Sequence, residues 1–544
     1  MAANESVEGM FPALDEAQIA RLLPYGIEGQ VAAGDIVYDQ GDTTHGVFVV
    51  LEGGFDVLNI VNGREEVIAS YGAGKFTGEV NQLSGRRSLV RCRARQASRL
   101  LEISRANLQR LMQNDAALGE IFLRAFILRR VYLINNSFGD AVLIGSSNSA
   151  DTLRLREFFS RNSHPFTFID VERDSDVQSM LDHFEVRMSD IPVVICRGDV
   201  VLRNPTNAET AACFGLNEGI DEEAIYDLIV VGAGPSGLAA AVYGASEGLN
   251  VLVVESNAPG GQAGSSSRIE NYLGFPMGIS GQELAGRAFV QAEKFGAHIA
   301  IARSAAALKC ESAPYVLQLS DGGTVRCRSL IVATGAQYRR LDLPNLAQFE
   351  GAGVYYGATP VEAQVCADQE VAIVGGGNSA GQAAVFLSGI AKHVYLLVRG
   401  PGLSDTMSRY LIARIEASPN ITLKAFTEIE ALEGNGHLER AHWRNNSTGE
   451  RFTCSTHHLF LMTGACPNTK WLNGCVALDS KEFIKTGADA SVDWPLRRPP
   501  YLLETSLPGV FAVGDVRAGS MKRVAAAVGE GSMAVQFVHK VLAE

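Results

Sequence analysis

Among the 544 residues there are nine cysteines, and no two of them are spaced Cys-x-x-Cys. That spacing is typical of redox dithiols and of many zinc sites, so the local sequence indicates neither chemistry. We therefore expect no metal site. Because the cysteines are scattered without an evident pairing pattern, the sequence favours a reducing compartment, and we expect a cytoplasmic protein.

Positive charge is also scarce, with 47 Lys and Arg against 60 Asp and Glu and a net charge of −13. Proteins bind duplex nucleic acid through cations that neutralise phosphates, so we expect no nucleic-acid partner. The N-terminus lacks the basic start and apolar core of a secretion signal. The uncharged stretch 228–246 has the length of a membrane span, but its glycine-proline interruption favours a nucleotide-binding turn, and we expect no membrane partner.

Two glycine turns are the strongest positive signal in the chain. Each follows a β-branched run, 229–231 or 371–374, and each precedes a helix of small residues. Glycines at such a turn let the backbone approach a pyrophosphate, whose charge then lies at a helix N-terminus. One such turn could serve packing alone, whereas two favour an enzyme with two dinucleotides. The expected binding residues are Gly232, Gly234, Pro235, Ser236 and Gly237 in the first turn and Gly375, Gly377, Asn378, Ser379 and Ala380 in the second.

The residue at the end of the next strand indicates which dinucleotide each turn binds. The strand-like run 251–254 ends in Glu255, whose carboxylate can accept hydrogen bonds from a ribose, as FAD or NAD requires. The corresponding run 394–398 ends in Arg399, which could pair with a 2′-phosphate. The second turn is therefore expected to bind NADPH rather than NADH, the alternative being an ordinary solvated arginine.

Further motifs follow in order: Gly260-Gly261-Gln262, Ile269-Glu270-Asn271-Tyr272, Ala333-Thr334-Gly335 and Gly514-Asp515. Together with the two turns, they make residues from about 225 to 544 resemble the thioredoxin reductase branch of the two-dinucleotide flavoprotein disulfide reductases. The resemblance implies FAD and NADPH as cofactors, with hydride passing from nicotinamide to flavin, and we expect a homodimer. It assigns FAD contacts to Glu255, Gln262, Asn271 and Asp515, with Gly261, Gly335 and Gly514 beside them.

Two departures from that family bear on the cofactors. The segment that crosses the flavin ends in Lys522, Arg523 and Val524, where the family usually has Arg-Gln-Ala, so we expect altered surroundings of the flavin ring. The family also usually has two adjacent arginines after the second strand, where this chain has Arg399-Gly400. This weakens the preference for NADPH without reversing it.

The redox dithiol of the family is missing. Gly357 and Pro360 stand where the two thiols would be, and neither can carry out dithiol exchange. Cys366 lies nearby and could act as a single thiol or as a small core residue. We assign no catalytic residue and expect electrons to leave the flavin for an external acceptor: a ferredoxin or flavodoxin, a quinone or oxygen, or the disulfide of another protein. The alternative is a non-enzymatic flavin-binding switch that acts through its N-terminal domains.

The first part of the chain contains short strands such as 47–51, bounded by glycine turns, as in an all-β roll. The segment 76–88 resembles the phosphate-binding segment of cyclic-nucleotide-binding domains. That resemblance assigns the ribose and phosphate contacts to Glu79 and Arg87, with Gly78 and Ser88 beside them. A nucleotide sensor and a ligand-free docking module are both open. The apolar spacing over 118–127 suits a helix that covers such a pocket, or a packed core helix.

Residues 139–217 resemble a thioredoxin or glutaredoxin fold, with strands at 141–145, 166–170 and 192–195 and a helix at 153–159. Pro192 would be its cis-proline, and the redox pair would fall at 149–152, where this chain has no cysteine.

The length allows roughly three to four domains of about 150 residues. We expect a multidomain α/β protein in which an N-terminal β-roll and a thioredoxin-like domain precede two Rossmann-like dinucleotide-binding domains. The expected boundaries are 10–135 for the cyclic-nucleotide-binding-like domain, 139–217 for the thioredoxin-like domain, 225–345 and 470–544 for the FAD domain, and 346–469 for the NADPH domain.

Overall fold

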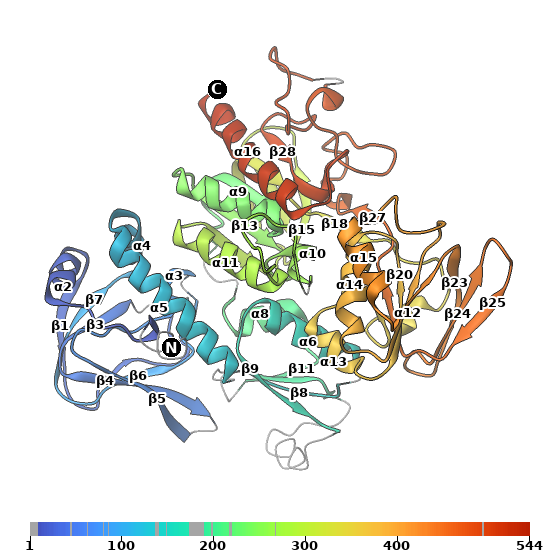
Figure 1. Cartoon of the computed structure of the whole chain (residues 1–544). Helices are drawn as coiled ribbons and strands as arrows, with labels where there is room; N and C mark the ends of the chain where they lie inside the picture. The colour runs from blue at the N-terminus through green and yellow to red at the C-terminus, as the bar shows by residue number, and fades with distance from the viewer. Residues whose placement is uncertain are drawn as a thin grey trace.

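The computed structural model describes residues 9–43, 46–61, 64–79, 81–84, 86–136, 141–147, 149–172, 190–196, 200–216, 220–266, 268–491 and 494–544. We name four units by their place in the chain: the β-roll domain (10–135), the thioredoxin-like domain (141–216), the first dinucleotide domain (225–345 and 470–544) and the second dinucleotide domain (346–469). Figure 1 shows the thioredoxin-like domain lying between the β-roll domain and the second dinucleotide domain, with the first dinucleotide domain above it.

The β-roll domain consists of two antiparallel sheets with strand orders β1-β7-β3 and β2-β6-β4-β5, so the all-β roll expected from the sequence is confirmed. Its strands are β1 (Ile27–Val31), β2 (Ile36–Tyr38), β3 (Val47–Glu52), β4 (Gly54–Val61), β5 (Arg64–Gly72), β6 (Arg91–Ala94) and β7 (Ser98–Ile103). Its helices are α2 (Glu16–Leu22), η1 (Leu23–Tyr25), α3 (Asn81–Ser84), α4 (Arg105–Asn114) and α5 (Ala116–Asn135). Apolar side chains of α5 pack on Phe76, which lies at the start of the nucleotide-like segment.

The thioredoxin-like domain has a four-stranded mixed sheet with the order β11-β10-β8-β9, in which only β8 and β9 run parallel. The elements are β8 (Ala141–Gly145), α6 (Ala150–Arg161), β9 (Phe166–Asp170), β10 (Val193–Cys196), β11 (Val200–Arg203) and α8 (Asn207–Cys213). The Ile191–Pro192 peptide bond is cis, as the sequence predicted for Pro192. The expected boundary residues 139 and 217 lie outside the described residues.

The first dinucleotide domain is built on a seven-stranded sheet with the order β14-β13-β12-β17-β16-β15, and β28 from the C-terminal segment also pairs with β17. Its N-terminal segment contains β12 (Ile225–Val231), α9 (Pro235–Ser246), β13 (Val251–Glu255), α10 (Gly261–Gly264), α11 (Gly281–Lys294), β14 (His298–Ile301), β15 (Ala305–Lys309), β16 (Tyr315–Leu319), β17 (Thr324–Val332) and β18 (Ala336–Tyr338). Its C-terminal segment contains η3 (Lys470–Leu472), η4 (Gly487–Ala490), β28 (Val510–Ala512), η5 (Gly514–Val516) and α16 (Val524–Ala543).

The second dinucleotide domain has a five-stranded parallel sheet with the order β19-β26-β20-β21-β22 and a three-stranded antiparallel sheet, β23-β24-β25. The antiparallel pair β18–β27 joins it to the first dinucleotide domain. Its elements are α12 (Leu346–Phe349), β19 (Val354–Tyr355), α13 (Pro360–Val365), β20 (Glu370–Val374), α14 (Asn378–Ser388), β21 (His393–Leu397), α15 (Arg409–Ala417), β22 (Ile421–Lys424), β23 (Thr427–Glu433), β24 (Arg440–Asn445), β25 (Arg451–Cys454), β26 (His458–Leu461) and β27 (Ala465–Pro467).

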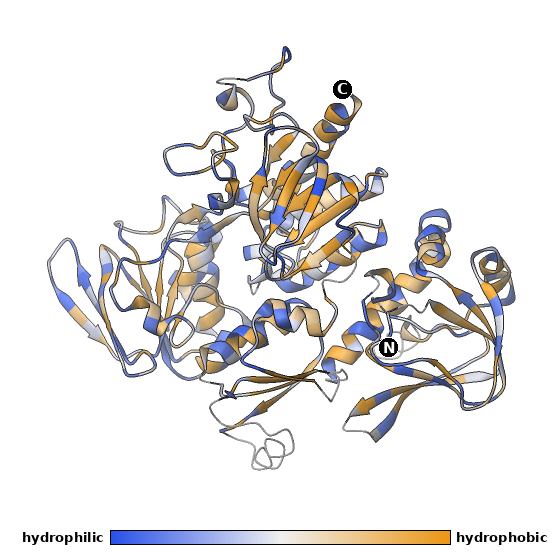
Figure 2. Ribbon diagram, turned by 180° about the vertical axis from the view of Figure 1, so that it is seen from behind, coloured by the Kyte–Doolittle hydropathy of each residue, from blue (hydrophilic) through white to orange (hydrophobic). Residues whose placement is uncertain are grey.

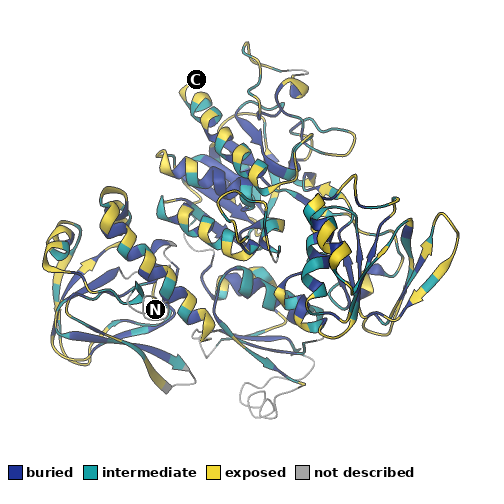
Figure 3. Cartoon of the chain, viewed as in Figure 1, coloured by how far each residue is buried: buried dark blue, intermediate teal, exposed yellow. Residues whose placement is uncertain are grey.

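Both dinucleotide sheets are apolar because helices or loops cover their faces. Figure 2 shows the central strands mostly in the hydrophobic colour, and Figure 3 shows the same strands buried while the outer sides of the helices are exposed. Within the described part of the chain, no helix has both the length and the apolar character needed to cross a bilayer.

The expectation that the cysteines stand unpaired is wrong for four of them. Disulfides join Cys196 to Cys213 and Cys310 to Cys475. The first pair connects β10 to the end of α8, and the second connects the end of β15 to the loop after η3. Both pairs are created by tertiary contacts rather than by local spacing, so a search for adjacent cysteines does not find them. They also remove the argument for a reducing compartment that rested on unpaired thiols.

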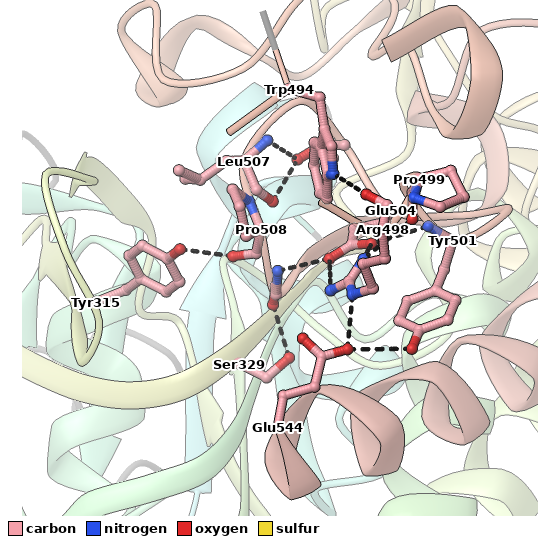
Figure 4. Close-up of polar contacts among 12 residues, drawn as sticks. Tyr315, Ser329, Trp494, Arg498, Pro499, Tyr501, Glu504, Leu507, Pro508 and Glu544 are labelled. Carbon is pink, nitrogen blue, oxygen red and sulfur yellow. Dashed lines mark hydrogen bonds and ion pairs between the residues drawn. The ribbon is translucent and has the colours of Figure 1, made fainter. Parts of the chain in front are cut away.

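A buried ion pair fixes the segment that leads into β28 (Figure 4). The carboxylate of Glu504 is fully buried and accepts hydrogen bonds from Nη1 and Nη2 of Arg498, at 2.7 and 3.1 Å. It also accepts from the backbone N–H groups of Tyr501 and Gly509, each at 2.8 Å. Arg498 Nε donates to Glu544 after the end of α16, at 2.6 Å. The network therefore ties the chain before β28 to the C-terminus.

Replacing Arg498 should show how strongly this network holds the domain together. Arg498→Ala leaves the Glu504 carboxylate buried without its cation, and such a loss costs about 3–5 kcal/mol. Urea unfolding should report a loss of this order. Arg451→Ala, which breaks an exposed ion pair with Glu430, should cost less than about 1 kcal/mol. Equal effects of the two substitutions would contradict the assignment.

Candidate functional site

The first glycine turn packs directly on the neighbouring strand. β12 ends at Val231, and Gly232 follows with a φ of 104°, a conformation that disfavours any residue with a Cβ. A Cβ at Gly232 would also overlap the carbonyl oxygen of Ala333, just beyond β17. Helix α9 begins at Pro235, with Pro at a position where its missing N–H is not needed. The strand–turn–helix expected from the sequence is therefore present.

Glu255, at the end of β13, holds this turn from the other side. Its side chain is buried, and Oε2 accepts a hydrogen bond from the backbone N–H of Ala233 at 2.7 Å. Oε1 accepts from the backbone N–H of Asn257 at 2.9 Å. Oε1 also accepts the backbone N–H of Ala258 at 3.3 Å, whereas Oε2 keeps a further lone pair, so Glu255 can still accept a ribose hydroxyl through Oε2.

The C-terminal segment closes the same turn. Gly514 N–H donates to Glu530 Oε2 of α16 at 2.6 Å, and a Cβ at Gly514 would lie 2.7 Å from Ser236 Oγ. The next residue, Asp515, faces the cavity described below; burial raises the pKa of its carboxyl, and the nearby Lys522 ammonium opposes that rise. Lys522 Nζ also donates to the backbone carbonyl of Asp515 at 3.3 Å. Charge of both signs is thus held at one end of the cavity.

A single cavity of about 610 Å³ runs along these residues and reaches the second dinucleotide domain. It brings together most of the residues predicted from the sequence. Those that line it are Gly232, Gly234, Pro235, Ser236, Glu255, Gly261, Gln262, Asn271, Gly335, Asn378, Ser379, Asp515, Lys522, Arg523 and Val524. The other predicted cofactor residues lie outside its lining: Gly237, Gly375, Gly377, Ala380, Arg399 and Gly514.

The residues present fit a dinucleotide at the first turn. A Cβ added at Gly234 or Gly335 would meet no atom within 4 Å, so the backbone is open to a ligand at both points. Gly234 precedes α9, whose first N–H groups face outward without helical partners and favour an anion. Glu255 supplies an acceptor and Gln262 an amide, whose Nε2 donates to the Ala336 carbonyl at 2.6 Å. This combination suits the pyrophosphate and ribose of FAD.

The second turn has the same construction. Gly375 follows β20 and lies against the carbonyl oxygen of Met462, while Gly377 has open space around it and precedes α14. The Asn378 side chain is held by the backbone N–H of Ser408, which donates to Oδ1 at 2.7 Å. Arg399 follows β21 and its side chain is 82% exposed, with Glu428 at 3.9 Å. The guanidinium is therefore available to a solvent-side phosphate.

The cavity also includes residues that the sequence analysis did not single out. Tyr338 of β18 and Ser379 of the second turn line the cavity from the two dinucleotide domains; burial raises the pKa of Tyr338, and the nearby Ser379 side chain opposes that rise. Arg161 reaches the cavity from α6 of the thioredoxin-like domain. Neither follows a recognised motif, so no local signal could have identified them.

The segment 357–360, where the family resemblance leads us to expect a dithiol, also meets the cavity. Gly357 and Ala358 line it, and Thr359 caps α13: its Oγ1 accepts the Val361 N–H at 3.1 Å, and Glu362 Oε2 accepts the Thr359 N–H at 2.8 Å. Cys366 at the other end of α13 is fully buried, and burial raises the pKa of its thiol well above the ordinary value. A thiol of this kind is a poor nucleophile.

In the β-roll domain, α5 covers the nucleotide-like segment. Glu79 is buried and pairs with Arg130 of α5, with Nη1 3.3 Å from Oε2. The Gly78 carbonyl accepts from Nη1 of Arg129 at 2.8 Å, and Phe126 lies against Gly78. The predicted ribose contact is therefore held by a cation of the covering helix.

The other two predicted nucleotide contacts are engaged within the protein. Ser88 Oγ donates to the Val90 carbonyl at 2.8 Å. The Arg87 side chain lies against Gly215 of the thioredoxin-like domain, and its backbone carbonyl accepts from Asn81 Nδ2 at 2.7 Å. The segment is thus built into an interface between domains.

Arg86 links this segment to the first dinucleotide domain, a contact that the sequence analysis missed. Its guanidinium carbon lies 4.7 Å from the ring centroid of Phe289 on α11. One helical turn further, Glu293 is buried, and desolvation raises the pKa of its carboxyl to about 7 against the opposing effect of Arg86, Arg105 and Arg130. The β-roll domain therefore meets α11 through buried charge.

Comparison with known proteins agrees with this geometry. Residues 226–531 match the family model of pyridine nucleotide-disulphide oxidoreductases, and residues 28–115 match that of cyclic nucleotide-binding domains. The chain is 32% identical over 366 residues to the NADPH-dependent thioredoxin reductase 3 of Arabidopsis thaliana, covering 63% of this chain and 65% of that protein.

Two further relatives are matched over almost their whole length. The thioredoxin reductase of Bacillus subtilis is 30% identical over 328 residues, which cover 60% of this chain and 97% of the relative. The crystal structure of T. acidophilum thioredoxin reductase superposes with a TM-score of 0.54 at 27% identity, covering 59% of this chain and all of that one. The chain therefore belongs to the pyridine nucleotide-disulphide oxidoreductases, as a thioredoxin reductase-like flavoprotein that uses FAD and NADPH and carries a cyclic nucleotide-binding domain before them.

Proposed function

We propose that the chain is an NADPH oxidoreductase that passes electrons from its flavin to an acceptor outside the chain, without an internal dithiol. The observation that carries the proposal is the shared cavity. Asn378 and Ser379 of the second turn line the same space as the first turn, and so does Gly357, which stands where the family resemblance expects one of the two thiols. The two cofactors, when bound, supply hydride transfer between nicotinamide and flavin.

The residues of the chain bind and orient the two cofactors. Glu255 accepts hydrogen bonds from a ribose while its remaining lone pairs hold the first turn closed. Arg399 discriminates for a 2′-phosphate through its exposed guanidinium. Tyr338 of β18 and Ser379 of the second turn face the same cavity from the two dinucleotide domains.

The acceptor reaches the cavity at its exposed edge. Lys522 and Arg523 are exposed there and carry two positive charges, beside Met521, whose exposed fraction is 67%. Such a surface favours an acceptor with an anionic face. Among the three classes, this supports a small acidic electron carrier such as a ferredoxin or flavodoxin over a neutral quinone. The disulfide of a separate protein remains the class that the relatives' names indicate.

The direct test is an anaerobic titration of the purified holoprotein with NADPH, followed by flavin absorbance. We expect full bleaching with about one equivalent of NADPH per flavin, because two electrons reduce one flavin. An acceptor screen then uses ferredoxin, flavodoxin, a quinone and oxidised thioredoxin. Absence of bleaching under all conditions would contradict the oxidoreductase and favour the flavin-binding switch.

Arg399→Ala tests the choice of nicotinamide cofactor. Loss of one charge-assisted contact to a 2′-phosphate should raise the KM for NADPH about tenfold and leave the KM for NADH unchanged. Steady-state kinetics with both cofactors provide the measurement. Arg440→Ala, an exposed arginine of the same domain paired with Glu433, should change neither value. An equal change for NADPH and NADH would show that Arg399 does not read the phosphate.

Regulation by a cyclic nucleotide is a second part of the proposal. In the structure, Glu79 is paired with Arg130 and Phe126 lies over Gly78, so a nucleotide can bind only if α5 moves away. The adjacent Arg86 rests on Phe289 of α11, so the same motion would be transmitted to the first dinucleotide domain. Repeating the NADPH titration with cyclic AMP and cyclic GMP tests this, and unchanged reduction rates with both would contradict it.

Glu293→Gln tests the buried contact between these domains. A carboxyl whose pKa rises to about 7 on folding makes the folded state bind more protons than the unfolded state between pH 4.5 and 7. Its contribution to stability is thus retained at low pH and lost as the pH rises through 7. Relative to the wild type, the variant should gain free energy of unfolding as the pH rises, with a small difference at pH 5 and one of about 3 kcal/mol at pH 8, and the melting temperatures should diverge accordingly.

The matched control is Glu283→Gln on the same helix. Glu283 is exposed and pairs with Arg287, so its replacement should leave the pH dependence of the melting temperature unchanged. If Glu293→Gln and the wild type respond identically to pH, the carboxyl does not titrate on folding as described.

A further inference from the structure

Helix α6 of the thioredoxin-like domain touches both dinucleotide domains. In its N-terminal half, Leu153 is 7% exposed and belongs to the apolar core of the second dinucleotide domain, with Ala363 of α13 and Cys366, which follows α13. Arg156 Nη2 donates to Gln364 Oε1 at 2.9 Å. Figure 1 shows α6 and α13 side by side. This end of the helix is therefore anchored next to the segment that replaces the dithiol.

The C-terminal end of α6 is anchored on the first dinucleotide domain. The Ser160 carbonyl accepts a hydrogen bond from Gln282 Nε2 of α11 at 2.6 Å. The Asn162 side chain donates to the carbonyl of Asn257, which follows β13, at 3.3 Å. Because both ends are held, the side chain of the last residue, Arg161, has a defined position relative to the cavity.

Arg161 lies in the lining of the cavity beside the first glycine turn. Its side chain is 14% exposed; Nη1 lies 3.2 Å from Glu157 Oε1, and Nη2 donates to the Gly261 carbonyl at 2.8 Å. Within the described part of the chain, Nε is buried and has no hydrogen-bond partner. Gly261 adjoins the turn itself, since a Cβ on it would lie 3.1 Å from the Cα of Gly234.

A guanidinium at this place has a specific chemical use. Gly234 is the open glycine of the turn, where the backbone admits a pyrophosphate. The helix N-terminus supplies only partial positive charge, whereas an arginine supplies a full charge and planar donors that match phosphate oxygens. Nη1 and Nη2 each carry a second N–H besides the one used for Glu157 or Gly261, and a phosphate oxygen can accept from these donors.

We infer that Arg161 is a FAD-binding residue supplied by the thioredoxin-like domain, which thereby completes the flavin site. This inference rests on the proposed binding of FAD at the first turn. If docking of α6 favours FAD binding, then FAD binding must favour docking of α6 by the same free energy, because linkage is reciprocal.

The test is the affinity of the full-length apoprotein for FAD, measured by quenching of flavin fluorescence. Arg161→Ala should raise the Kd at least about tenfold, as expected for loss of a hydrogen bond to a charged group. Hydrogen exchange of residues 150–161 should slow on addition of FAD in the wild type and not in the variant. An alanine variant with the wild-type Kd would overturn the inference.

Arg154→Ala on the same helix is the matched control. Arg154 bonds only to residues of its own domain among its described contacts, Asp151, Asn204, Pro205 and Asn207, so its replacement should leave the Kd for FAD unchanged. If both variants bind FAD equally weakly, the effect comes from the stability of the domain and the inference is wrong. If the melting temperature of the apoprotein shows that Arg161→Ala does not fold, Arg161→Lys is measured instead. Lysine keeps the charge but not the planar donors, so this variant should still bind FAD about threefold more weakly than the wild type. Wild-type affinity for FAD in Arg161→Lys would overturn the inference.

The outcome is separable from that of the proposed function. NADPH may bleach the wild-type flavin while Arg161→Ala keeps its affinity, in which case the function stands and the inference fails. Conversely, weak FAD binding by the variant supports the inference even if NADPH bleaches neither protein.

Discussion

Close contact between backbones at Ser236 is the constraint on which the flavin site depends. Helix α9 begins beside this residue, and the α16 backbone at Gly531 approaches the Ser236 carbonyl so closely that no Cβ fits between them. Gly514 also packs against the Ser236 hydroxyl, since a Cβ at Gly514 would lie 2.7 Å from its oxygen. Two chain segments separated by almost three hundred residues therefore share one turn, because only glycine allows the strand, the helix and the returning segment to meet there.

The buried ion pair of Arg498 and Glu504 supports this contact without touching it, because it fixes the chain that leads to Gly514. It holds the chain before β28, and β28 leads directly to Gly514 and Asp515. Replacing the pair by apolar residues of the same volume could be equally stable, but a carboxylate that also accepts two backbone N–H groups defines the path of the loop as well. The network around Glu504 therefore helps to fix the position of Asp515, which lies about a dozen residues further along the chain.

The domains that precede the flavoprotein core are joined to it by buried contacts. α6 spans from the α13 core to the edge of the flavin cavity, and Arg86 stacks on Phe289 of α11. In the segment where the family resemblance leads us to expect a dithiol, Thr359 caps the start of α13. A thiol pair must be exposed and mobile to react with a partner, whereas a capped helix start packed against another domain is suited to fixed geometry. The capped start of α13 and the docking of the thioredoxin-like domain are therefore consistent with each other.

The sequence alone determined the two strand–turn–helix units, the β-roll and the carboxylate of Glu255, because each depends on residues near one another in the chain, whereas the cis Pro192 was expected from the resemblance to a thioredoxin fold. The periodic apolar strands and the glycine spacing encode these features locally. The tertiary structure alone decided the disulfide partners of Cys196 and Cys310, the pairing of Glu79 with Arg130, and the presence of Arg161 beside Gly261, a hundred residues further along the chain. These contacts arise when independently folded faces pack together, and the spacing of residues along one segment carries no information about which distant segment will cover it.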